Sequence, residues 1–242
     1  MYRYCRLHLD FDATALGAAL AQAEKCGTWL PHFVTGNYEG DWSAIPLRSV
    51  DGHADNIYSL STVSPEAYRD TPQLAAAPYL REVLAAFQCP QTSVRLLKLA
   101  AGSVIKEHRD QGLTFGDGSV RLHVPVRTSP QVEFYIEDEQ VVMGAGECWY
   151  IDATLPHRLA NRGERDRVHI VIDCLVNDWL RQRFAEAGYR PRKKSPLEER
   201  GVRPEQLDDV IAALRAMDTE TGLQQAKELE ALRDAEVDSD QR

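Results

Sequence analysis

The chain has 242 residues, a formal net charge of −9, and a composition of 43% hydrophobic and 27% charged residues. This length allows one sizeable core with a small appendage, and the acidic balance argues against a nucleic-acid partner, which favours basic surfaces. No apolar run approaches the roughly 18–20 residues that span a bilayer, and the N-terminus lacks the apolar segment of a signal peptide. Five scattered cysteines without a CxxC pair favour reduced thiols and a cytoplasmic location.

The first ninety residues mix helical and extended patterns. Residues 2–9 alternate in character and predict a strand, and the Ala- and Leu-rich run 13–25 predicts a helix with Asp12 as its cap. A short strand is expected at 45–49, and a helix over 78–88 has proline in its first turn. Between them lies an aromatic stretch, which is either a packed loop over the core or the wall of a pocket.

From residue 93 the pattern becomes β. Short strands separated by Gly, Asp and Pro are typical of a sandwich or barrel, jelly rolls included. We therefore predict a mainly β fold with flanking helices and a jelly-roll core over about 93–176. The expected strands are 93–100, 120–127, 132–136, 141–143, 147–152 and 167–175.

Helical patterns return after the last of these strands. A helix over 177–187 ends at Gly188, and the basic, proline-containing run 188–203 predicts a solvated linker. Two amphipathic helices follow within 204–242 and either pack on the barrel or join two copies of the chain into a homodimer. The expected organisation is thus a domain over 1–187, a linker and a helical appendage.

The tripeptide His-x-Asp occurs three times, at 8–10, 53–55 and 108–110. The first straddles a strand end and a helix start, and the second lies in a loop without a regular strand to present it. Only the third, just after the first core strand, is followed at a suitable place by a further histidine, His157, which comes after the expected strand 147–152 and a turn. Because neighbouring strands of a barrel meet at one rim, His108, Asp110 and His157 are expected to converge. Two histidines and one carboxylate suit Fe(II), or Mn and Co in its place.

Two strands carry the pattern Arg-x-His. Side chains alternate along a strand, so Arg121 and His123 share one face, and Arg167 and His169 share another. These faces are either solvated, as antiparallel sheets allow, or buried. A buried arginine needs an anionic partner, and a dicarboxylate bound at the metal would accept a bidentate pair from it. No Gly-x-Ser-x-Gly or similar nucleophile motif is present, so no catalytic residue beyond the metal site is expected.

The run 95–180 resembles the aspartyl/asparaginyl β-hydroxylase family, including bacterial proline hydroxylases that act on free amino acids. The resemblance implies an Fe(II)- and 2-oxoglutarate-dependent dioxygenase with a double-stranded β-helix core, which uses O₂ to hydroxylate an unactivated carbon. The segments that carry it are HRD at 108–110, VRLHV at 120–124, GECWYID at 146–152, LPH at 155–157 and DRVHIVID at 166–173.

The resemblance assigns roles to single residues. His108, Asp110 and His157 correspond to the iron ligands, and Arg167 to the clamp for the distal carboxylate of 2-oxoglutarate; Arg121 and His123 match positions that help to hold this co-substrate. The animal enzymes of the family lack the carboxylate ligand found here as Asp110, which brings this chain closer to the bacterial branch. They also contact 2-oxoglutarate through a serine where this chain has Leu97.

The expected substrate is an amino acid, free or presented on a peptide or carrier. The candidate substrate residues are arginines that could pair with its carboxylate and aromatic residues that could wall its pocket: Arg48, Arg95, Arg127, Tyr38, Trp42 and Trp149. Two alternatives remain at this stage: a metal-binding cupin-like barrel that acts as a sensor or scaffold, and a cupin-type metal hydrolase or isomerase. Neither requires an arginine clamp, so Arg167 favours the dioxygenase.

Overall fold

The computed structural model describes residues 3–60, 63–110, 112–191, 196–202 and 206–240. The chain divides into two compact units, Met1–Pro191 and Arg192–Arg242, and each is described by itself. No helix in the described part of the chain is long and apolar enough to cross a membrane.

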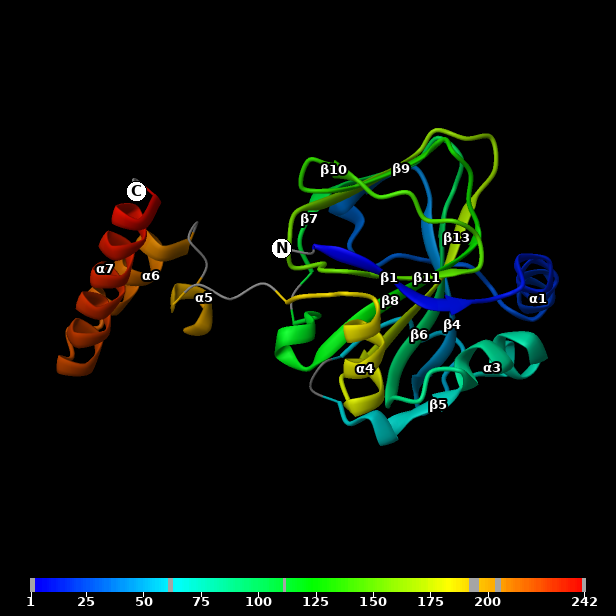
Figure 1. Cartoon of the computed structure of the whole chain (residues 1–242), viewed down its shortest axis with the longest axis horizontal. Coiled ribbons are helices and arrows are strands. Elements are labelled where there is room, and N and C mark those ends of the chain that lie inside the picture. Colours follow the sequence, from blue (N-terminus) through cyan, green and yellow to red (C-terminus); the bar gives the residue numbers. More distant parts are fainter. Residues whose placement is uncertain (1–2, 61–62, 111, 192–195, 203–205, 241–242) are drawn as a thin grey trace. The chain divides into compact units, whose positions relative to one another are not determined.

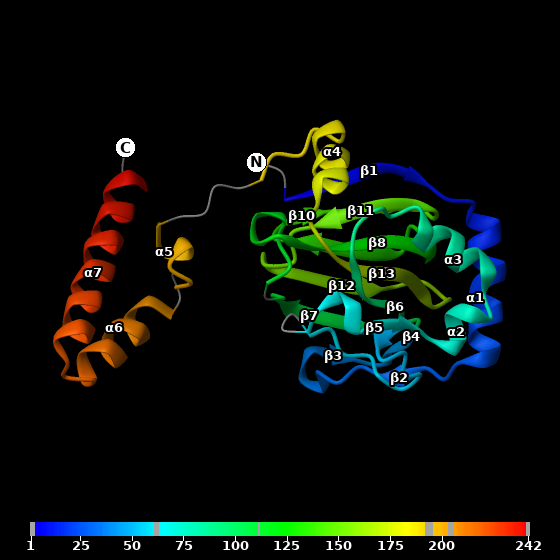
Figure 2. The same ribbon diagram turned by 90° about the horizontal axis from the view of Figure 1, so that it is seen from below.

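The first unit is built on two antiparallel sheets (Figures 1 and 2). The larger one has the order β1-β11-β8-β13-β6-β4-β2, with β5 paired to β4, and the smaller one has the order β10-β9-β12-β7-β3. This arrangement confirms the predicted mainly β, jelly-roll class. The strands are β1 (Tyr4–Asp10), β2 (Leu30–Pro31), β3 (Tyr38–Glu39), β4 (Trp42–Val50), β5 (Tyr68–Asp70), β6 (Gln91–Leu99), β7 (Val104–His108), β8 (Ser119–Arg127), β9 (Val132–Ile136), β10 (Glu139–Gln140), β11 (Glu147–Ile151), β12 (His157–Asn161) and β13 (Arg167–Leu175).

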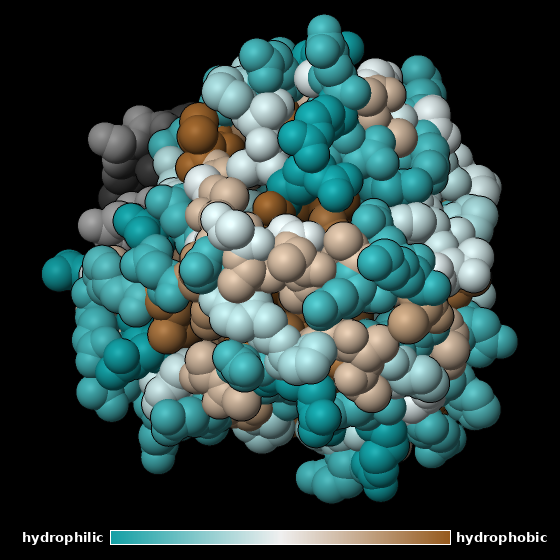
Figure 3. Space-filling model, turned by 90° about the vertical axis from the view of Figure 1, so that its right-hand side faces the viewer, coloured by the Kyte–Doolittle hydropathy of each residue, from teal (hydrophilic) through white to brown (hydrophobic). Residues whose placement is uncertain are grey.

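Helices cover the outer face of the larger sheet. They are α1 (Ala13–Cys26), α2 (Pro72–Ala75), α3 (Pro78–Ala85) and α4 (Asp178–Glu186), and α1 and α3 lie side by side (Figure 1). As predicted, Asp12 caps α1, accepting hydrogen bonds from the backbone N–H groups of Thr14 and Ala15. Helix α1 buries leucines and alanines and leaves its polar side chains exposed, and the molecular face on that side is mostly hydrophilic (Figure 3).

The alternation of β8 and β13 separates two environments. Leu122 and Val124 of β8 pack with Val168 and Ile170 of β13 in the core beneath the helices. The residues between them therefore face inward, toward the smaller sheet. That interior contains a second apolar cluster with Trp42, Leu99, Ile105, Phe134, Ile136, Ile151 and Leu159.

Several expected strands differ from the observed ones. The prediction of a strand at 141–143 is wrong. Strand β10 ends at Gln140, and the segment that follows is irregular, although the side chains of Val141 and Met143 are buried. The expected strand 45–49 is longer, spanning Trp42–Val50, and pairs with β6, so the sheets extend beyond the expected core of 93–176. Two strands that present candidate ligands, β7 and β12, are not among the expected ones.

Strand β7 contains a bulge that hides its pattern. Leu159 and His157 of β12 are two residues apart, but they pair with Ile105 and His108, which are three residues apart. The extra residue leaves Lys106 and Glu107 both exposed, while Ile105 and His108 both line the interior. Simple alternation therefore cannot be read from the sequence of β7.

The second unit contains α5 (Pro196–Glu199), α6 (Leu207–Ala216) and α7 (Glu220–Asp240). It has an apolar cluster of its own, made by Leu197, Leu207, Ile211, Ala226 and Leu229. Helix α5 lies within the predicted linker, of which residues 192–195 and 203 are outside the described residues. Because Leu197 is only 1% exposed, part of that linker belongs to the core of this unit.

Candidate active site

Two neighbouring strands of the smaller sheet present the two histidines of the candidate metal centre. His108 is the last residue of β7 and His157 the first residue of β12; they are direct cross-strand partners with ring centroids 4.2 Å apart. Asp110 lies just beyond β7, where its N–H donates to the carbonyl of Ala153 at 2.8 Å. One potential ligand atom from each of the three residues lies within 4.8 Å of the others.

The protonation of these groups fits a divalent metal. The carbonyls of Lys106 and Leu155 accept hydrogen bonds from Nδ1 of His108 and of His157, at 2.8 and 3.0 Å. Because a carbonyl only accepts, each Nδ1 carries the proton and each Nε2 keeps its lone pair for a metal. Burial, with the neighbouring His108, lowers the pKa of His157 to about 4.

Asp110 completes the donor set as an anion. Burial acts to raise the pKa of this carboxyl, but the Arg121 guanidinium outweighs it, and the net shift is downward. The cluster thus contains two imidazoles and one carboxylate, the donor set of a non-haem Fe(II) centre with open positions.

Asp173 holds the guanidinium that contacts Asp110. Arg121 donates from Nε and Nη2 to the two oxygens of Asp173, at 2.7 and 2.9 Å, and from Nη1 to Oδ2 of Asp110. Burial acts to raise the pKa of Asp173, but Arg121 and Arg95 outweigh it and lower that pKa to about 2. Arg121 was predicted to help hold 2-oxoglutarate; it lines the cavity, and it contacts both the predicted metal ligand Asp110 and a second carboxylate, Asp173.

The metal cluster opens into a cavity of about 840 Å³ between the two sheets, and Arg167 and His123 also line it. Arg167 is 4% exposed, and no carboxylate among the described residues pairs with it. It donates from Nη2 to Nδ1 of His169 at 2.7 Å, while its Nε has no partner. Burial lowers the pKa of Arg167 to about 9, so it remains a cation at neutral pH.

Further polar atoms in this part of the interior lack partners. Both ring nitrogens of His123 and Nε2 of His169 are buried without a hydrogen bond. Because buried polar groups are normally satisfied, this cluster around an unpaired guanidinium fits an anionic ligand with several acceptor oxygens. A dicarboxylate has that chemistry, since one end can pair with Arg167.

The cavity includes two of the six candidate substrate residues. Arg95 and Trp42 line it. Arg95 is 3% exposed and donates to Asp173 and to the carbonyl of Ile57. The ring of Trp42 stacks on His32 with centroids 3.5 Å apart.

The other four candidates are not among the described residues that line the cavity, and their role in substrate binding stays a prediction. Arg48 pairs with Asp70 at 2.8 Å, and Arg127 lies at the end of β8, opposite Val168. Trp149 donates to Glu147 and packs near Tyr4. The ring of Tyr38 makes an edge contact with the ring of Trp42.

Two residues of the site, Asp173 and Ser59, were not among the predicted site residues. Asp173 shares a face of β13 with Arg167 and His169, and alternation along the strand could have marked it. Ser59 lies outside the longer strands, and no pattern in the sequence marks it. His32 belongs to the aromatic stretch that was expected to be either a packed loop or a pocket wall, and it lines the cavity. Leu97, which the resemblance aligns with a serine of the animal enzymes, lines the cavity.

Several known proteins are similar to this chain in sequence. The family model described as aspartyl/asparaginyl beta-hydroxylase matches residues 16–176. The L-proline cis-4-hydroxylase of Rhizobium meliloti (strain 1021) is 31% identical over 136 residues, which are 55% of this chain and 48% of that protein. The L-proline cis-3-hydroxylase 1 of a Streptomyces species is 27% identical over 186 residues, 72% of this chain and 62% of that protein. The chain thus spans about half of the first relative and less than two thirds of the second.

Among solved structures, HygX from Streptomyces hygroscopicus, with nickel and 2-oxoglutarate bound, aligns with a TM-score of 0.46 and 12% identity. The alignment covers 73% of this chain and 84% of that one.

Proposed function

Because the chain belongs to the aspartyl/asparaginyl β-hydroxylase family, we propose that it is an Fe(II)- and 2-oxoglutarate-dependent dioxygenase that hydroxylates an unactivated carbon of an amino acid. One observation carries this proposal. The cluster of two histidines and one carboxylate shares a cavity with the buried guanidinium of Arg167, which has no carboxylate partner among the described residues. A metal that binds this cluster and a dicarboxylate that pairs with Arg167 would therefore meet in one place.

The bound Fe(II) and 2-oxoglutarate would supply the activation of O₂ and the oxidising power. The chain contributes binding and orientation. His108, Asp110 and His157 hold the metal, and Arg167 pairs with the distal carboxylate of 2-oxoglutarate, so that the reacting end of the co-substrate is directed at the metal. Apolar side chains such as Phe134 and Ile151 line the cavity and would limit the access of water to a bound metal.

The substrate we propose is a free amino acid, with a peptide- or carrier-borne amino acid as the alternative. The matched relatives are proline hydroxylases by name, so L-proline is the first compound to test. We also propose a cytoplasmic location, which is consistent with the five free cysteines. A homodimer joined by α6 and α7 is a further part of the proposal.

Succinate formation tests the activity. The purified protein is incubated with Fe(II), ascorbate, 2-oxoglutarate and a panel of amino acids and peptides that begins with L-proline, and succinate and hydroxylated product are measured. His157→Ala and Asp110→Ala are expected to lose turnover and Fe(II) binding. His53→Ala, which removes an exposed histidine from another His-x-Asp tripeptide, is the matched control and is expected to retain both.

Absence of turnover with the whole panel, together with no binding of 2-oxoglutarate by calorimetry, would refute the dioxygenase. A metal-binding scaffold or a cupin-type hydrolase would bind the metal without 2-oxoglutarate, so the calorimetric result also separates these two alternatives from the proposal.

A further inference from the structure

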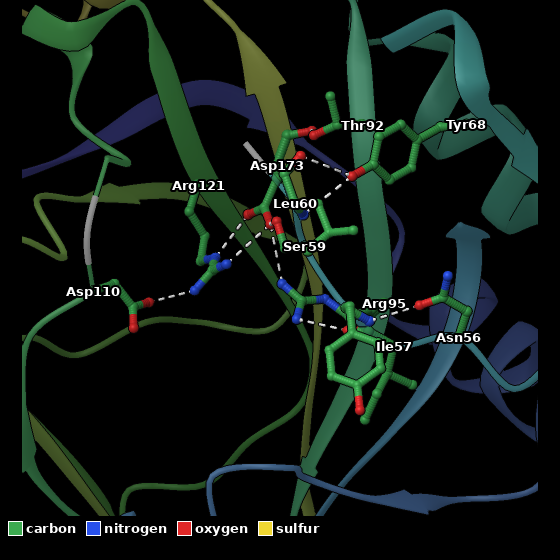
Figure 4. Close-up of polar contacts among 11 residues, drawn as sticks. Asn56, Ile57, Ser59, Leu60, Tyr68, Thr92, Arg95, Asp110, Arg121 and Asp173 are labelled. Atoms are coloured by element: carbon green, nitrogen blue, oxygen red, sulfur yellow. Dashed lines mark hydrogen bonds and ion pairs between the residues drawn. The ribbon is translucent and has the colours of Figure 1, made fainter. Parts of the chain in front are cut away.

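An ionic chain leads from the candidate metal centre to two buried residues, Asp173 and Arg95. Asp110, Arg121, Asp173 and Arg95 alternate in charge, and each contacts the next (Figure 4). Asp173 is 2% exposed and is the central carboxylate, because it accepts from both guanidiniums. The four charges cancel, which is the condition for burying them together.

Asp173 holds one edge of the planar, fork-shaped guanidinium of Arg121. The Nε–Nη2 edge makes a bidentate pair with both oxygens of that carboxylate, which sets the plane of the guanidinium. Its remaining nitrogen, Nη1, is thereby directed at Oδ2 of Asp110. The other oxygen of Asp110, Oδ1, lies 3.9 Å from Nε2 of His108, on the side of the metal cluster.

We propose that Asp173 is a positioning residue: through the fork of Arg121 it occupies one oxygen of Asp110 and leaves the other to bind the metal as a single ligand. This inference rests on the proposed function only for the presence of the metal centre. Partners of this kind, one contact removed from the metal, typically change metal affinity by about 10–100-fold when they are lost.

The same carboxylate also holds part of the cavity wall. Ser59 donates its hydroxyl to Asp173 at 2.6 Å, and Arg95 donates to the carbonyl of Ile57 at 3.2 Å (Figure 4). Ser59 and its neighbour Leu60 line the cavity. Asp173 therefore links the orientation of a metal ligand to the placement of a wall segment from a distant part of the sequence.

The test measures metal affinity without turnover. Mn(II) is titrated into the full-length protein in the absence of 2-oxoglutarate and substrate, and binding is followed by calorimetry and by the electron paramagnetic resonance signal of free Mn(II). Asp173→Asn is expected to weaken binding about 10–100-fold. Asp70→Asn, which removes the same charge from the Arg48 pair outside the cavity, is the matched control and is expected to bind like the unmodified protein.

Two further variants separate positioning from folding and from charge. Asp173→Asn leaves two buried guanidiniums with one carboxylate, which can unfold the protein; the double variant Asp173→Asn/Arg95→Gln restores the balance of one cation and one anion. Arg121→Lys keeps the charge but loses the planar fork. Both are expected to keep a native near-ultraviolet circular dichroism spectrum and to show the weakened Mn(II) binding.

Native affinity in the charge-balanced double variant, or in Arg121→Lys, would overturn the positioning role even if the enzyme makes succinate. If the unmodified protein itself binds no Mn(II), the metal centre fails, and with it both proposals. The two failures are thus distinguishable.

Discussion

Arg167→Met should make the ligand-free protein more stable while abolishing its response to 2-oxoglutarate. Arg167 is a buried cation whose pKa falls from 12.5 to about 9 through burial, with no carboxylate partner among the described residues. That fall corresponds to about 5 kcal/mol against the charged form, as an upper limit. The lost hydrogen bond to His169 would cost about 1 kcal/mol in the variant.

Methionine fills a similar volume without the charge, so we expect a net gain of about 1–4 kcal/mol in the free energy of unfolding. The assay is urea denaturation with Mn(II), with and without 2-oxoglutarate. In the unmodified protein, a ligand concentration 100 times the Kd adds about 2.7 kcal/mol. The variant should gain nothing at that same concentration.

Arg158→Met is the matched control, because it removes a strand arginine whose side chain is 40% exposed and lies outside the cavity lining. It should keep the response to 2-oxoglutarate and change stability by less than about 1 kcal/mol. The reasoning is refuted if Arg167→Met is less stable than the unmodified protein without ligand and is still stabilised by 2-oxoglutarate.

Three further predictions concern the fold. Burial, followed by the charge of Arg95, lowers the pKa of His32 to about 3. Below about pH 6.5 the imidazole is therefore protonated in the unfolded chain but not in the folded one. The free energy of unfolding should then fall by up to about 1.4 kcal/mol per pH unit toward pH 3. His32→Phe should reduce this slope in urea unfolding between pH 7 and 5, and an unchanged slope would contradict it. Asp12→Ala should cost about 1 kcal/mol through loss of the α1 cap, measured by thermal unfolding against the exposed control Asp55→Ala. Leu122→Ala, at a fully buried position, should cost about 2–5 kcal/mol in urea, and a loss below 1 kcal/mol would place this side chain outside the core.

Regular alternation made much of the fold predictable. Strands β8 and β13 carry Arg-x-His on one face and aliphatic residues on the other, and the structure buries both faces. The bounds of β13 agree with the prediction, because tertiary packing and local pattern coincide there. Residues 141–143 read as a strand because two of the three bury their side chains, but burial from an irregular segment gives the same apolar pattern.

The candidate site was predictable where residue type and order are informative. His108, Asp110, His157 and Arg167 meet around one cavity, as the ordered combination of the motifs that contain them indicated. The candidate substrate residues were chosen by type alone, and only Arg95 and Trp42 reach the cavity. Whether an arginine faces a cavity or a surface carboxylate depends on pairing between distant strands, as the pair of Arg48 with Asp70 shows, and no local pattern records that.

The bulge in β7 links metal binding to the register of the smaller sheet. Because Ile105 and His108 are three positions apart in the sequence, a regular strand would bury one of the two side chains and expose the other. Only the bulged pairing with β12 turns both inward. A metal that binds both His108 and His157 can therefore bind only when β7 and β12 pair in this register, and not when the strands are shifted relative to one another. The free energy of metal binding is added to the stability of that register. Amide hydrogen exchange at Lys106 and Glu107 should accordingly slow when the metal is added, because the bound ion would hold β7 and β12 together in this register.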